Sequence, residues 1–286
     1  ESENIDDFLE NLSIDKTVEI SSIRGGYSNA LKQLNKFIEV GYQDYAQYRS
    51  DPSKEASSQL SPYFHSGQIS THEVFDKISE LESWSPESIN PKMVGRREGW
   101  WGSSDNFESF MDELITWREL GYHTCVRRAN YNQYSSLPEW AIKTLHEHSS
   151  DEREYIYSLD ELTYSQTHDE IWNAAQNQLR TQGVIQNYLR MLWGKKILEW
   201  TPNPQIALSY MITLNDRYSL DGRDPNSYSG VFWILGRYDR AWGPERNIFG
   251  KIRYMTSDST ARKFNLKPYL EQWGNESLDV STSILK

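Results

Sequence analysis

Residues 183–228 carry side chains that could hold an anionic or redox-active cofactor. Arg190 and Asp221 stand among apolar residues, and a buried arginine requires a carboxylate or an anionic ligand as its partner. Trp193 and Trp200 are seven residues apart, which on a helix places them on one face and about 10 Å apart along the axis. This spacing suits electron transfer, although a structural salt bridge and core tryptophans would produce the same pattern.

Two further features extend this pattern. Trp172 lies on the preceding expected helix, where packing could place it between the other two tryptophans. The hydroxyl-rich residues 57–61 precede a helix, and hydroxyls together with free backbone N–H groups can bind phosphate without a positive patch. An ordinary cluster of helix N-caps is the alternative for this loop.

The composition excludes several classes of protein. The single cysteine, Cys125, rules out a disulfide framework and an iron–sulfur cluster ligated by about four thiolates, and it fits a reducing, cytoplasmic location. Of six histidines only His146 and His148 are close in sequence, and that spacing points two helical side chains to different sides, so no metal site is expected. No apolar run approaches the roughly 18 residues of a membrane span, and no membrane partner is expected.

Charged residues are distributed unevenly along the chain. The net charge of −11 argues against a nucleic-acid partner, because phosphate contacts need clustered lysine and arginine. Residues 237–263 nevertheless hold seven lysines and arginines against three acidic residues. A local basic face is one interpretation of this segment, and an ordinary solvated face is the other.

The elements that must position these residues are helices. Apolar residues recur every three or four positions, which predicts an all-α protein, and the best strand pattern, residues 155–159, is short. We expect a linker at 1–24, one helical catalytic domain at 25–273 and a flexible tail at 274–286. The helical pattern covers residues 30–42, 70–81, 107–120, 137–146, 169–182, 184–200, 204–218 and 260–267.

Six separated motifs, in order, resemble the FAD-binding domain of class II cyclobutane pyrimidine dimer photolyases, within the photolyase/cryptochrome family. The resemblance spans roughly residues 25–269, which is most of the chain. The motifs read SSQLSPYFHSGQIS, MDELITWREL, GVIQNYLRMLWGKKILEW, LNDRYSLDGRDPNSYSGVFW, ERNIFGKIRYM and ARKF. The resemblance implies an all-helical domain that holds a bent FAD with no metal. It also implies light-driven repair, in which excited reduced flavin donates an electron that splits a dimer flipped out of DNA.

The resemblance assigns a role to each matching residue. Asn215 would face the flavin N5, Glu113 would hydrogen-bond a carbonyl of the dimer, and Met191 would touch the dimer. Electrons would pass along Trp193, Trp172 and Trp200, in that order outward from the flavin. The flavin would be held by Tyr48, Ser57, Ser58, Leu60, Ser61, Asn187, Arg190, Asn215 and Asp221. The lesion and its DNA would be held by Glu113, Trp117, Met191, Trp233, Arg253 and Arg262.

The sequence also departs from the family pattern. Gln186 stands where a histidine is common and Leu192 where a tyrosine is common. The chain begins where the interdomain linker of the family would lie, so we expect no antenna chromophore on this chain, and we expect a monomer. A short cryptochrome-like flavoprotein, which senses light or redox state without repairing DNA, is the alternative function, and a truncated module that is inactive alone is a third.

Overall fold

The computed structural model describes residues 5–96 and 98–274, and within them it is almost wholly helical. The predicted all-α class is confirmed: the β pairing in the described residues is one isolated bridge between Arg246 and Gly250. The expected tail at 275–286 lies outside the described residues. The helices are α1 Ile5–Glu10, α2 Tyr27–Lys36, α3 Tyr45–Tyr48, α4 Ser61–His65, α5 Thr71–Leu81, α6 Asp105–Met111, α7 Arg118–Arg127, α8 Glu139–Glu147, α9 Leu159–Thr163, α10 Glu170–Gln182, α11 Asn187–Glu199, α12 Pro204–Tyr218, α13 Pro225–Ile234, α14 Ser257–Lys263 and α15 Lys267–Trp273.

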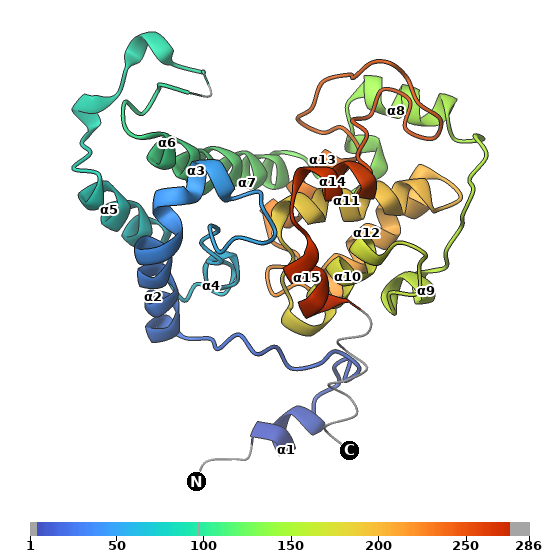
Figure 1. The fold of residues 1–286 in the computed structure, drawn as a ribbon, viewed down its shortest axis with the longest axis horizontal. Helices are drawn as coiled ribbons and strands as arrows, with labels where there is room; N and C mark the ends of the chain where they lie inside the picture. The colour runs from blue at the N-terminus through green and yellow to red at the C-terminus, as the bar shows by residue number, and fades with distance from the viewer. Residues whose placement is uncertain (1–4, 97, 275–286) are drawn as a thin grey trace.

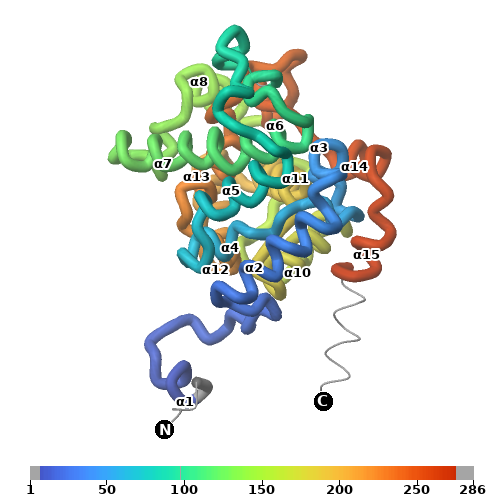
Figure 2. Tube along the Cα trace, turned by 90° about the vertical axis from the view of Figure 1, so that its left-hand side faces the viewer, coloured from blue at the N-terminus to red at the C-terminus, as the bar shows by residue number. Residues whose placement is uncertain are grey.

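Two hydrophobic clusters organise the helices. The larger one is built around α10, α11, α12 and α13, and the smaller one around α2, α5 and α6. Figure 1 shows these groups on opposite sides of the molecule, with α4 between them, and α7 runs from one side to pack against α13 on the other. The expected linker at 1–24 contains α1, which lies at the edge of the molecule (Figure 2).

One expected helix was wrong, and one helix was missed. The weak strand pattern at 155–159 forms no strand, because Ser158 and Glu161 form a capping box that begins α9 there. The single helix expected at 260–267 is two helices, because a second capping box at Thr256 begins α14 earlier and Pro268 occupies the first turn of α15. The helix α13 was not expected, since its continuous apolar and serine pattern shows no helical period.

The start of α11 is fixed from two sides. Helix α10 ends at Gly183 in the left-handed conformation (φ 74°), where a Cβ would lie 2.6 Å from the Cγ of Leu220. The Leu220 N–H donates to the Gly183 carbonyl at 2.8 Å, which holds the loop after α12 beside α11. Gln186 caps α11 through Oε1, and its Nε2 donates to the carbonyl of Arg49 at 2.9 Å. This one side chain therefore joins the two halves of the molecule.

Candidate functional site

A polar cluster lies where α11, α12 and the loop after α12 meet. Arg190 Nη1 donates to Asn215 Oδ1 at 2.7 Å, and Arg190 Nη2 lies 3.8 Å from Asp221 Oδ1. The Asn215 amide donates in turn to the hydroxyl of Ser227 on α13. The structure therefore brings together three of the residues expected at the flavin ring, and it fixes the orientation of the Asn215 amide from both ends.

The carboxylate of Asp221 is held in its charged form. Burial by itself raises the pKa of Asp221, but the Arg190 charge and hydrogen bonds from Ser219 and Ser61 outweigh burial and lower the pKa below its ordinary value. Ser61 belongs to the hydroxyl-rich loop at 57–61. The hydroxyl-rich loop therefore reaches the polar cluster through Ser61.

The cluster fits an anionic ring that carries hydrogen-bond acceptors. Among the described residues, Arg190 makes one hydrogen bond within 3.5 Å, to Asn215, although a guanidinium carries five N–H donors. Its separation of 3.8 Å from Asp221 is too long for a further hydrogen bond. A half-buried arginine with unused donors provides the donor set that a partly anionic flavin ring requires.

The other residues expected to bind the flavin differ in burial and in their contacts. Leu60 is fully buried, and Ser57 and Ser58 are half-buried beside it. Asn187 is exposed in the first turn of α11. The hydroxyl of Tyr48 accepts a hydrogen bond from its neighbour Gln47 at 3.0 Å.

Glu113 lies in a π-helical turn, Asp112–Trp117, between α6 and α7. Such turns are rare and often mark functional sites. Glu113 forms an ion pair with Arg49, which follows α3 and which the sequence did not single out. Burial disfavours the charge of Arg49, but Glu113 outweighs burial and raises the arginine pKa. Burial, followed by the charge of Glu113, also raises the pKa of Tyr45, one turn before Arg49.

The two tryptophans expected to flank the lesion contact each other. The rings of Trp117 and Trp233 are 4.4 Å apart between centroids and tilted by 55°, and Tyr238 lies about 6 Å from both. Trp117 Nε1 donates to Asp112 at 2.9 Å, which fixes its ring from the π-helical turn. Met191 is half-buried against the larger core, one residue after Arg190.

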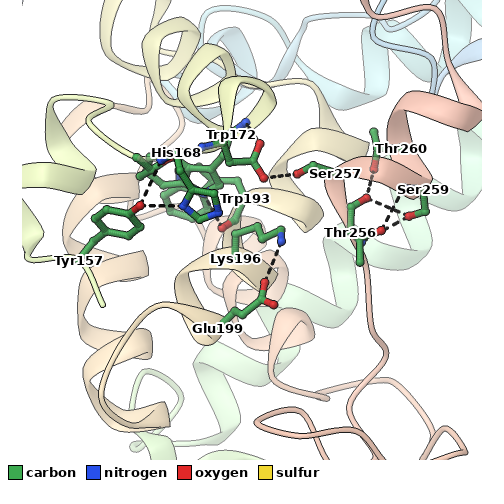
Figure 3. Close-up of polar contacts among 12 residues, drawn as sticks. Tyr157, His168, Trp172, Trp193, Lys196, Glu199, Thr256, Ser257, Ser259 and Thr260 are labelled. Carbon is green, nitrogen blue, oxygen red and sulfur yellow. Dashed lines mark hydrogen bonds and ion pairs between the residues drawn. The ribbon is translucent and has the colours of Figure 1, made fainter. Parts of the chain in front are cut away.

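The three tryptophans expected to carry electrons form a contiguous buried row. Trp193 is 2% exposed and its Nε1 donates to Gln176 at 2.8 Å. Trp172 Nε1 donates to the Trp193 carbonyl at 2.9 Å, and the Trp172 ring lies 5.7 Å from that of Trp200. Figure 3 shows Trp172 and Trp193 close together, with Tyr157 and His168 beside them. Trp200 is buried too, and Tyr157 and His168 contact its ring at 5.5 and 5.2 Å.

The expected basic residues lie on exposed loops and helix ends. Arg253 stacks on Trp242 at 5.0 Å, and Arg240 lies over the same ring at 4.6 Å. Arg262 is exposed in the last turn of α14. The structure therefore gathers part of the basic segment around one tryptophan.

Solved structures resemble this architecture closely. A class III photolyase from Agrobacterium tumefaciens superposes with a TM-score of 0.65 at 17% identity, covering 95% of this chain and 50% of that one. A cryptochrome from Synechocystis superposes with a TM-score of 0.63 at 15% identity, covering 92% of this chain and 48% of that one. The chain has the photolyase/cryptochrome fold.

Curated proteins named deoxyribodipyrimidine photo-lyase are similar to this chain in sequence. A deoxyribodipyrimidine photo-lyase from Methanothermobacter thermautotrophicus is 41% identical over 267 residues, which cover 93% of this chain and 55% of the relative. The protein of the same name from Potorous tridactylus is 38% identical over 260 residues, which cover 90% of this chain and 45% of the relative. The chain thus spans about half the length of the relatives that it matches. No protein-family model matches the chain.

Several residues that contact the candidate site escaped the sequence analysis. Arg49, Gln176 and Ser227 each contact an expected site residue, but no local pattern connects them, because their partners lie 12 to 64 positions away. Gln186 was noticed only as a departure from the family, and the structure shows that it caps α11. In the described residues no group of three or more potential ligands could hold a metal, and none of their helices is both long and apolar enough to span a membrane.

Proposed function

We propose that this chain is the FAD-binding part of a class II cyclobutane pyrimidine dimer photolyase and repairs DNA by light-driven electron transfer. The observation that carries the proposal is the dual role of one helix. Helix α11 presents Arg190 to the polar cluster in its first turn and Trp193 to the buried row one turn later, and Trp200 follows at its C-cap. The similarity to proteins named deoxyribodipyrimidine photo-lyase supports the same reaction.

FAD, when bound, supplies the electron that splits the dimer. Arg190, Asn215 and Asp221 would hold its ring, and Ser57, Ser58 and Ser61 would hold its phosphate side. The further donors of Arg190 would stabilise negative charge on the ring, while the ionised Asp221 would keep Arg190 in place. The Asn215 amide is already oriented, so it presents a fixed polar group without further reorganisation.

Glu113 and the paired tryptophans form the proposed lesion side. Glu113 is paired with Arg49. A carboxylate only accepts hydrogen bonds, so Glu113 must take up a proton before it can donate one to a carbonyl of the dimer. Trp117 and Trp233 are too close to admit a base between them, so the dimer either stacks on their outer faces or separates the rings. A dimer pairs poorly in DNA, which lowers the cost of flipping it to this site. Arg253 and Arg262 would contact the DNA backbone.

Repair of a defined lesion tests this proposal. Protein reconstituted with FAD is reduced by dithionite, mixed with an oligonucleotide that contains one thymine dimer and illuminated with blue light, and the recovery of thymine absorbance is followed. We expect recovery that needs both light and reduced flavin. A protein that binds reducible FAD but restores no thymine would instead support the cryptochrome-like alternative, which the net charge of −11 favours.

The tryptophan row has a separate test. Trp200→Phe should slow photoreduction of the flavin while leaving repair by dithionite-reduced protein intact. Trp140→Phe is the matched control, because Trp140 packs on the same core outside the row. Equal loss of both activities in the Trp200 variant would show that Trp200 has a structural role only. The monomeric state, the absence of an antenna chromophore on this chain and the cytoplasmic location stay predictions.

A further inference from the structure

A hollow of about 400 Å³ opens at the outer end of the tryptophan row. Trp200 borders it together with the segment before α9, the residue His168 before α10 and the loop that includes Arg246 and Tyr254. The close-up in Figure 3 shows the same region, where Lys196 reaches Glu199 beside the row. The volume is sufficient for one aromatic ring with a short side chain.

Acidic side chains outnumber basic ones around the hollow. Lys196 pairs with Glu199 at 2.8 Å, which leaves that carboxylate neutralised. Glu152 and Glu154 also line the hollow, and neither has an ion-pair partner among the described residues. The remaining cation, Arg246, lies over the ring of Tyr254 at 4.8 Å. The lining therefore carries three carboxylates against two cations, which favours a cationic ligand.

Aromatic surface lies next to these carboxylates. The rings of Tyr155 and His168 stack with centroids 3.9 Å apart, and Tyr155 is 40% exposed. His168 also lies 5.2 Å from the ring of Trp200. The charge of Glu154 raises the pKa of the Tyr155 hydroxyl, so this carboxylate acts directly at the stacking surface. A planar ligand on Tyr155 would therefore be close both to a negative charge and to the end of the row.

We propose that this hollow binds a small phenol that carries a positive charge, and that the phenol returns an electron to Trp200 after Trp200 has passed one inward. This inference rests on the proposed photoreduction along the tryptophan row. A phenol is oxidised more easily than an indole, and its ring can stack on Tyr155 while its cationic group faces Glu152 and Glu154. An anionic reductant would be repelled by the same two carboxylates.

The electron-transfer step balances without a further reactant. Trp200, short of one electron, accepts one from the phenol, and the phenol hydroxyl releases its proton to water. The products are neutral Trp200 and a phenoxyl radical that leaves the hollow. The balance needs no proton from Tyr157, whose hydroxyl accepts the His168 backbone N–H at 3.1 Å and shares a hydrogen bond of 2.7 Å with His168 Nδ1.

Tyramine is the probe, and 3-(4-hydroxyphenyl)propionate is its anionic counterpart. Binding of each to the FAD-loaded protein is measured in the dark by calorimetry, and the rate of flavin photoreduction is then measured against the concentration of each. We expect tyramine to bind more tightly than the anion and to accelerate photoreduction with saturation at its own dissociation constant. The double variant Glu152→Gln/Glu154→Gln should weaken tyramine binding by roughly 3- to 10-fold, while Glu80→Gln, a control on α5, should not.

Equal binding of the two phenols would overturn the inference, as would tyramine binding that the double variant leaves unchanged. Photoreduction that rises linearly with tyramine, equally in the wild type and the double variant, would show collisional reduction from bulk solvent and would also overturn it. Failure of the proposed repair function is detected in a different experiment, in which dithionite-reduced protein would restore no thymine absorbance. Binding in the dark depends on neither DNA nor light, so the two failures are distinguishable.

Discussion

Replacing Lys195 by methionine should change how the stability of the protein depends on pH. Lys195 lies on α11, is 3% exposed and donates through Nζ to the carbonyl of Ile234 at the end of α13. Burial lowers its pKa from 10.5 to about 7, with Asp239 opposing the shift and Arg253 adding to it. A charged lysine is therefore costly at this position.

The sign and size of the effect follow from linkage. Because the folded pKa is below the unfolded one, the unfolded chain binds more protons between pH 7 and 10.5, and the free energy of unfolding rises with pH in that window. With these two pKa values, the contribution of Lys195 increases by about 2–3 kcal/mol from pH 6 to pH 9. The Lys195→Met variant lacks this contribution. Methionine has a similar length and no charge, so it leaves the packing of α11 nearly unchanged.

Urea unfolding, followed by tryptophan fluorescence at pH 6, 7, 8 and 9, measures this difference. The free energy of unfolding of the variant, relative to that of the wild type, should be highest at pH 6 and should decrease as the pH rises. Loss of the hydrogen bond to Ile234 changes the difference in free energy of unfolding by the same amount at every pH, so it does not affect how that difference depends on pH. Parallel curves for the two proteins would refute the reasoning, since Lys195 would then titrate alike in the folded and unfolded chains.

Three other substitutions have defined outcomes. Gln176→Leu leaves the buried Nε1–H of Trp193 without its acceptor and should lower the free energy of unfolding by about 1–3 kcal/mol in urea titrations. Asp221→Asn removes a carboxylate whose pKa is lowered in the folded protein, and it should weaken FAD retention. In the wild type this carboxylate contributes stability that is present above its unfolded pKa of about 4 and is lost as the pH falls through the folded value. The variant should lack this pH-dependent contribution, which thermal unfolding from pH 3 to 7 measures. Arg253→Ala should weaken DNA binding equally for all sequences and reduce its salt dependence by about one counterion, measured by fluorescence anisotropy.

Sequence patterns predicted the helices whose apolar face is regular. Periodicity placed the helix at 204–218 correctly, because its caps, Asn203 at the start and Ser219 at the end, are local. It failed at α13, where apolar and serine residues alternate without a helical period, and at 260–267, where a capping box and a proline decided the boundaries. Local signals therefore set the ends of helices more reliably than periodicity does.

The candidate site was predictable where a residue stands out from its sequence surroundings and unpredictable where nothing local marks its partner. The pairing of Arg190 with Asp221 could be expected, since both stand among apolar residues in one segment. The ion pair of Arg49 with Glu113 could not, because the two are 64 positions apart and each looks like an ordinary surface charge. Its consequence is functional: the carboxylate proposed to meet the lesion already has a partner.

Helix α11 explains why so much chemistry is concentrated in one segment. Helices α10, α12 and α13 pack around it, and Gly194 lets α13 approach so closely that a Cβ would lie 2.1 Å from the Cδ1 of Ile234. Much of α11 is therefore enclosed, and the polar side chains on its buried part must find partners inside the protein. Arg190 finds Asn215 and Asp221, whereas Lys195 finds a backbone carbonyl. Arg190 keeps further donors beside the other residues expected at the flavin ring, and a cofactor bound at the polar cluster would use them.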